Sequence, residues 1–197
     1  MNRARVDSAI LGIGQSCSGA LGHGAVIILK IHMGLQKEYI QDKIDTLAAM
    51  QQLEKYIESF PIKLKRFSSI ELLNRPAPGK WSKKEILGHL IDSAINNLKR
   101  FTEIQFLPQP YSLISYRQDE LVITNDYQNL PLDHMLDLWQ ALNRQIVFVV
   151  RNISPDKLNY AVDQQHENKE IKTLGWIICD YVAHMAHHFR QIFPGHE

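Results

Sequence analysis

Three histidines, His89, His184 and His188, dominate the chemistry that this sequence could carry. His184 and His188 are four residues apart, so on a helix their side chains project from one face, with Cβ atoms about 5–6 Å apart. His89 lies in an earlier amphipathic segment, within a polar stripe. Imidazoles from two helices that meet could hold a divalent metal and leave a coordination position open for chemistry. The spacing therefore indicates a candidate metal site.

The histidine pair also has a plainer interpretation, in which two partly exposed imidazoles only form hydrogen bonds. The pair lacks the glutamate of the His-Glu-x-x-His motif, because Met185 occupies that position. A zincin-type protease with an internal glutamate base is therefore excluded. His187 points about 100° away from His188 on a helix, so we expect it at the surface or in a supporting role.

The polar stripe around His89 continues along the same helix face at spacings of three and four residues. Such a stripe either faces solvent or lines a cavity inside a helical bundle, and the pattern leaves both open. Asp92 follows His89 by one turn, and Asp180 precedes His184 by one turn; each carboxylate could orient an imidazole or simply be solvated. Arg100 could line the pocket or pair with an acidic residue elsewhere. The candidate pocket residues are Asp92, Asn96, Arg100 and Asp180.

Composition excludes several classes of protein. The net charge is +1 and no dense Lys/Arg stripe carries interleaved aromatics, so we expect no nucleic-acid partner. No stretch approaches the roughly 20 consecutive apolar residues that span a bilayer, so we expect no membrane anchor. The two cysteines, Cys17 and Cys179, are far apart and suggest no disulfide framework, which predicts a cytoplasmic protein. Neither cysteine looks like a nucleophile, and no Ser-His-Asp arrangement is visible.

The first 33 residues differ from the rest of the chain. Half of its ten glycines lie between Gly12 and Gly24, without the strand-turn-helix context of a dinucleotide-binding loop. We expect residues 1–33 to be disordered, or translation to begin at Met33. Residues 34–197 then form one domain, a length that suits a single core.

Four amphipathic segments must position the histidines. Ser82 and Glu85 form a capping box, and Trp81 and Ile86 a hydrophobic staple, at the start of the second. Thr173 can cap the fourth.

The first segment carries Leu47 and Ala48 in its apolar stripe. Pro61 should break or kink this segment. No convincing strand pair is visible, so the sequence predicts an all-α four-helix bundle. The expected helices cover about residues 36–59, 82–106, 131–153 and 173–193.

About 24 residues, Leu107 to Leu130, separate the second and third helices without a sustained period. That length is too great for a tight hairpin and predicts a long crossover. The third helix carries Leu138, Trp139, Ile146 and Val150, which could serve either as core or as the face of a homodimer.

Two motifs resemble the DinB-like superfamily, in its branch of bacillithiol S-transferases and metal-dependent hydrolases. Lys80-Trp-Ser-Lys-Lys-Glu-Ile-Leu-Gly-His89-Leu-Ile-Asp-Ser93 is similar to the second helix of that family, and Thr173-Leu-Gly-Trp176 leading into His184-Met-Ala-His-His188 to its last helix. The resemblance covers about residues 40–193, and residues 1–33 have no counterpart in it.

The resemblance implies a four-helix bundle and one divalent metal ion, nickel or zinc, held by His89, His184 and His188. Three neutral imidazoles leave the metal its full charge, which would lower the pKa of a bound water towards ~7 or hold a small thiol as its thiolate. The expected partners are a low-molecular-weight thiol such as bacillithiol and an electrophilic substrate. The leading interpretation is a thiol S-transferase; a hydrolase using the same site and a non-catalytic bundle stay open.

Overall fold

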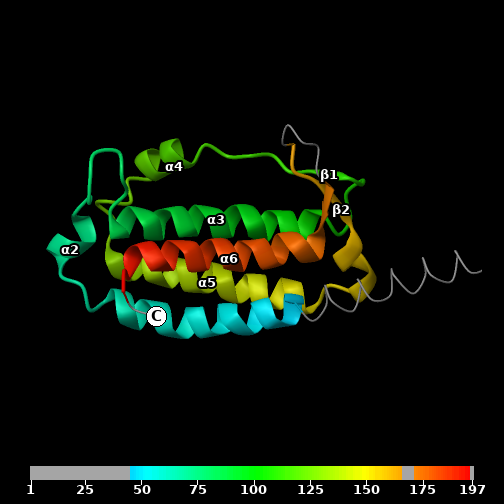
Figure 1. The fold of residues 1–197 in the computed structure, drawn as a ribbon, viewed down its shortest axis with the longest axis horizontal. Coiled ribbons are helices and arrows are strands. Elements are labelled where there is room, and N and C mark those ends of the chain that lie inside the picture. Colours follow the sequence, from blue (N-terminus) through cyan, green and yellow to red (C-terminus); the bar gives the residue numbers. More distant parts are fainter. Residues whose placement is uncertain (1–44, 166–170, 196–197) are drawn as a thin grey trace, which may run out of the picture. The chain divides into compact units, whose positions relative to one another are not determined.

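The computed structural model describes residues 45–165 and 171–195. Within this part of the chain, four long helices pack side by side as a bundle (Figure 1), which confirms the predicted fold class. They are an initial helix over residues 45–64, α3 (Lys83–Glu103), α5 (Leu132–Arg151) and α6 (Leu174–Ile192). Predictions that concern residues 1–33 and 36–44 lie outside the described residues.

The helices α3 and α5 contact each other and run in the same direction (Figure 1). Parallel neighbours need a connection that returns to the starting end of the bundle, and the long predicted crossover supplies it. The crossover is not structureless, however. It contains β1 (Tyr111–Ser112) and α4 (Gln118–Thr124), and α4 packs against α3.

Two short strands that the sequence did not predict lie near the start of α6. β2 (Ala161–Asp163) pairs antiparallel with β3 (Ile171–Thr173) and parallel with β1, giving the order β1-β2-β3. Strands of two or three residues are too short to show an alternating pattern. Between α5 and β2 lies a 3-10 helix, η1 (Pro155–Asn159), and α2 (Ser69–Leu73) precedes α3.

The predicted caps are present. The Ser82 hydroxyl accepts from the Glu85 amide, and the Glu85 carboxylate accepts from the Ser82 amide, completing the capping box. Thr173 caps α6 by accepting from the amide of Trp176. These bonds satisfy amides that the first turn of a helix leaves unpaired. α3 ends at Glu103, three residues before the predicted Phe106.

Of the two predicted effects of Pro61, a break does not occur, because residues 45–64 are continuously helical. A proline in a helix interior leaves the carbonyl four residues earlier without its donor, here that of Ile57. Gln140 of α5 fills this role, because its amide nitrogen donates to the Ile57 oxygen at 2.9 Å. A bond from the neighbouring helix thus compensates for the proline.

The core lies between the four helices and is built from apolar side chains of each. In the first helix the buried stripe is Met50, Leu53, Ile57, Phe60 and Leu64, whereas Leu47 and Ala48, which the periodicity placed in it, are exposed. In α5 the residues that could serve either as core or as a dimer face are mostly core. Trp139, Ile146 and Val150 are buried, and Leu138 is 37% exposed.

An aromatic cluster joins the first helix to α5 and α6. Phe60 stacks on Phe189 with ring centroids 4.3 Å apart and contacts Trp139 at 4.8 Å. The Lys83 ammonium donates to the Ile192 carbonyl at 2.7 Å, so the start of α3 is tied to the end of α6. α3 and α6 are therefore antiparallel neighbours. No helix among the described residues has the length and apolar character needed to cross a membrane.

Candidate metal centre

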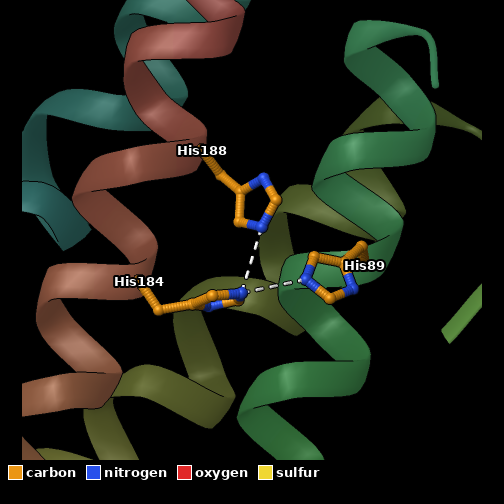
Figure 2. A group of neighbouring side chains, drawn as sticks. All are labelled: His89, His184 and His188. Carbon is orange, nitrogen blue, oxygen red and sulfur yellow. Dashed lines mark hydrogen bonds between the residues drawn. The ribbon is translucent and has the colours of Figure 1, made fainter. Parts of the chain in front are cut away.

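His89, His184 and His188 come together where α3 and α6 face each other (Figure 2). Their candidate ligand atoms all lie within 4.8 Å of one another. The Nε2 atom of His184 is 3.2 Å from Nε2 of His89 and 3.0 Å from Nε2 of His188. His89 and His188 are buried and His184 is half-buried. The structure thus brings together the three histidines that the spacing singled out.

Burial keeps these imidazoles uncharged. It lowers the pKa of His89 to about 3 and that of His184 to about 4, with further lowering from neighbouring histidines. Burial also lowers the pKa of His188, although its hydrogen bond with Gln191 acts in the opposite direction. Neutral imidazole is the form that binds a metal, so no ligand has to lose a proton near neutral pH.

Gln191 fixes the tautomer of His188. Its side-chain oxygen lies 2.8 Å from His188 Nδ1, and its amide nitrogen lies 3.0 Å from Nε2 of His187. The amide donates to His187 and the carbonyl accepts from His188, so His188 carries its hydrogen on Nδ1. The Nε2 lone pair of His188 is therefore directed at the other two histidines. The exposed His187 takes the supporting place expected of it.

The donor set fits a divalent metal better than a set of hydrogen bonds. A neutral imidazole nitrogen either donates or accepts, yet Nε2 of His184 lies between two other Nε2 atoms. One atom with a single hydrogen or a single lone pair leaves one of these contacts unfavourable. Imidazole nitrogens that share a tetrahedral metal at ~2.0–2.1 Å lie about 3.3 Å apart. The two separations measured from Nε2 of His184 are within a few tenths of an ångström of that value.

Asp92 is held by the crossover rather than by His89. Its Oδ1 accepts from the Tyr127 hydroxyl at 2.7 Å and from the Asn125 amide at 3.1 Å. Burial raises the pKa of Asp92, while these two bonds lower it, and the net shift is upward. Among the described residues, neither Asp92 Oδ2 nor His89 Nδ1, both buried, has a hydrogen-bond partner. The carboxylate is thus fixed one turn from His89 without contacting its ring nitrogen.

A glycine makes this arrangement of the crossover possible. A Cβ built on Gly88 would lie 2.1 Å from a ring carbon of Tyr127. Only a residue without a side chain lets the Tyr127 ring lie so close to α3 and reach Asp92. In the motif Gly88-His89-x-x-Asp92, the glycine therefore leaves room for the Tyr127 ring, and the histidine is a candidate metal ligand. The aspartate, one turn further on, accepts the hydrogen bond from Tyr127.

Two cavities meet the histidines along the seam between α3 and α6. The wide cavity, about 760 Å³, borders His188 and is lined by residues that include Trp81, Ile86, Lys80 and Gln191. The polar cavity, about 280 Å³, borders His184 and is lined mainly by polar side chains of α3, α6 and the crossover. The wide cavity lies against the start of α3 and the end of α6, and the polar cavity lies against later residues of α3 and earlier residues of α6. The histidines therefore lie between the two cavities.

The remaining predicted pocket residues differ in their placement. Arg100 and Asp180 line the polar cavity. The Asn96 amide donates to the backbone oxygen of Asp92 at 2.8 Å, and Asn96 lines neither cavity. Partial burial raises the pKa of Asp180, and among the described residues no hydrogen bond joins it to His184. Of the polar stripe on α3, Arg100 thus lines a cavity, whereas Asn96 bonds the backbone of its own helix.

Sequence reasoning missed three residues beside the site. Gln191 follows His188 by three residues, a helical spacing at which side chains meet, so the signal was present. Tyr127 and Asn125 lie in the crossover, where no periodicity indicates which side chains turn toward α3. Trp81 does more than staple the helix start, because its ring lies 4.9 Å from that of His89 and lines the wide cavity.

Comparison with known proteins agrees with the fold. The structure of YfiT from Bacillus subtilis, described as "a probable metal-dependent hydrolase with an unusual four-helix bundle topology", matches with a TM-score of 0.65 at 23% identity over 75% of this chain and 83% of that chain. A weaker match, the mycothiol-dependent maleylpyruvate isomerase, has a TM-score of 0.45 at 15% identity over 79% of this chain and 59% of that chain. No curated protein matches. The sequence profile of the DinB superfamily matches residues 49–192, and the chain belongs to that superfamily.

Proposed function

We propose that this protein is an enzyme that uses one divalent metal ion, nickel or zinc, held by His89, His184 and His188. The support is the convergence of three uncharged imidazoles on one point, with Gln191 directing the lone pair of His188 inward. Imidazole donors suit borderline metals of this kind. When bound, such an ion would lower the pKa of a thiol or a water molecule at the site.

We further propose that the reaction is transfer of a low-molecular-weight thiol to an electrophilic carbon. The thiol releases its proton to solvent, its sulfur forms a bond to the carbon, and the bond from that carbon to the leaving group breaks, so that the leaving group departs with the bonding electrons. The observation that carries this proposal is the presence of two cavities of different character on the two sides of the histidines. A transferase needs room for two organic substrates beside one reactive centre, whereas hydrolysis needs one substrate and water.

Each of the two cavities suits a different substrate of the proposed reaction. The wide cavity, with the Trp81 ring and Ile86 in its wall, suits an electrophile with an apolar part. The polar cavity suits the thiol, because its wall offers hydrogen-bonding and charged groups. Tyr127 and Asn125 bind the crossover to α3, and the crossover contributes Asp119 to the wide cavity and Tyr116 to the polar cavity. A reducing compartment, such as the cytoplasm expected from the cysteine content, would keep the thiol reduced.

Hydrolysis is the second candidate. YfiT, whose fold is similar, is described as a probable metal-dependent hydrolase, and water could take the place of the thiol at the same histidines. A superfamily fold does not fix the chemistry, so the choice depends on the co-substrate. A bundle without catalytic activity is the third interpretation.

The test is turnover of an electrophile such as monochlorobimane by nickel- or zinc-loaded protein, with and without a panel of small thiols. The transferase proposal predicts a thioether product only when a thiol is present, and its loss in His184→Ala. Turnover of ester or amide substrates without any thiol would replace it with the hydrolase. Absence of both activities in metal-loaded protein would favour the non-catalytic interpretation.

A further inference from the structure

The polar cavity is lined by the positively charged side chain of Arg100, to which the proposed reaction assigns no role. Arg100 of α3 is half-buried, and its Nη2 donates to the Ile114 carbonyl of the crossover at 2.7 Å. Its guanidinium carbon lies 5.6 Å from the centre of the Tyr116 ring. The hydrogen bond to Ile114 uses one of the five N–H donors of the guanidinium, so other donors are available to a ligand.

Among the described residues, three other arginines form ion pairs, whereas the exposed Arg66, Arg144 and Arg190 form none. Arg75, Arg117 and Arg151 are all exposed, yet each forms an ion pair with a glutamate. Arg100 is less exposed, and among the described residues no carboxylate lies within ion-pair distance of it. Burial lowers the pKa of Arg100, although Tyr116 and Tyr111 act in the opposite direction, and the group stays charged near neutral pH. A partly desolvated cation without a counter-ion strongly favours an anionic ligand.

The walls around Arg100 are suited to a polar ligand. Ser93 and Asn97 of α3 and Asp180 of α6 line the same cavity, as does His184. Arg100 is eleven residues beyond His89, which is roughly 16 Å along a helix axis, and long helical side chains point back toward the helix start. A ligand of moderate length could therefore reach from the histidines to the guanidinium.

We propose that the polar cavity binds the carboxylate end of the thiol substrate, with Arg100 receiving the carboxylate while the sulfur reaches His89, His184 and His188. A planar guanidinium matches a carboxylate with two parallel hydrogen bonds. Ser93, Asn97 and Asp180 are placed to contact hydroxyl or amino groups between the two ends. This inference rests on the proposed function, because it assumes that the metal-bound substrate is a thiol.

The test uses nickel-loaded protein and two series of probes of increasing chain length. One series is ω-mercaptoalkanoic acids and the other is the corresponding ω-mercaptoalkanamides, which have the same shape without the charge. The thiolate-to-nickel absorption band gives the dissociation constant of each probe without any turnover. We expect the carboxylate to bind at least tenfold tighter than the amide at the chain length that spans the cavity, and the preference to vanish at short lengths.

Arg100→Gln should remove this preference, so that the carboxylate and the amide bind alike, and the absorption band that both still produce shows that the variant is folded. Arg100→Lys should retain part of the preference, because it keeps the charge without the planar pair of donors. Arg117→Gln is the matched control, since it removes the same charge from a residue that does not line the cavity. It should keep the full preference.

Each failure has its own meaning. If no thiol of either series produces the absorption band, the proposed function is wrong. If the band forms but carboxylates and amides bind alike at every length, the thiol substrate is not anchored by its carboxylate. A carboxylate preference that persists in Arg100→Gln would also overturn the role assigned to Arg100.

Discussion

Tyr127 of the crossover donates a hydrogen bond of 2.7 Å to Asp92 of α3, one turn beyond His89. Both residues are buried, and the bond joins positions 35 apart in the chain. It fixes the crossover to the helix that presents the first histidine. The wall of the site is therefore held by a buried polar contact rather than by apolar packing alone.

Replacing Tyr127 by Phe should lower the free energy of unfolding by about 1–2 kcal/mol, because a buried carboxylate loses its strongest donor. Urea unfolding measures the loss. Tyr111→Phe is the matched control, since the Tyr111 hydroxyl also bonds a carboxylate, that of Glu103, at 2.8 Å, but with both residues only half-buried. Equal losses in the two variants would show that burial does not strengthen the Asp92 bond.

Gly88→Ala should be destabilising by about 1–3 kcal/mol, because the new methyl group overlaps the Tyr127 ring and the core is already filled there. The overlap is specific to one partner, which a double-mutant cycle can show. In a Tyr127→Ala background, the same glycine substitution should cost much less. Additive losses in the double variant would mean that the cost of Gly88→Ala arises elsewhere in α3.

Gln191→Ala should weaken metal affinity by about 10- to 100-fold, the usual effect of removing a group that orients a histidine ligand. Competition with a chromophoric chelator gives the dissociation constant. Gln191→Glu retains an acceptor for His188 Nδ1 and should restore most of the affinity. Arg190→Ala, the adjacent exposed residue, is the control. An unchanged affinity in Gln191→Ala would contradict the tautomer argument.

Acid should weaken the start of α3 through Glu85. Burial alone would raise the pKa of this carboxyl, but its bonds with Arg75 and the Ser82 amide outweigh burial and lower the pKa below its ordinary value of 4.5. The unfolded chain therefore takes up a proton first as pH falls. The stabilisation is complete above about pH 4.5 and is lost as pH falls through the lowered folded pKa.

Urea unfolding between pH 6 and pH 3 tests this contribution. Glu85→Gln should cost about 1 kcal/mol at pH 6, a modest value because Arg75 is exposed. The difference between the wild type and the variant should shrink as the pH falls below about 4.5. A difference that stays constant over this range would exclude a role for the charge of Glu85.

The sequence predicted the bundle and the histidine cluster because both depend on helical periodicity. Ser82, Glu85 and Thr173 marked helix starts through local hydrogen bonds that need no tertiary context. The continuation through Pro61 could not be predicted in this way. Its compensating donor, Gln140, lies 83 residues from Ile57.

The supporting residues of the site were harder to predict for the same reason. Tyr127 and Asn125 act across the crossover, where the chain has no repeating pattern to indicate direction. Periodicity also placed Leu47 in the core and made both Asn96 and Arg100 candidate pocket residues. In the structure Leu47 is exposed, Asn96 bonds its own helix, and only Arg100 reaches a cavity.

The central claim is that His89, His184 and His188 together hold one divalent metal ion. Elemental mass spectrometry on purified protein tests it most directly, with each histidine replaced by alanine and His187→Ala as the matched control. We predict about one nickel or zinc per chain in the wild type and in His187→Ala, and loss of the metal in the other three variants, with helicity retained. A wild type that takes up neither metal, or one whose metal survives all three substitutions, would contradict it.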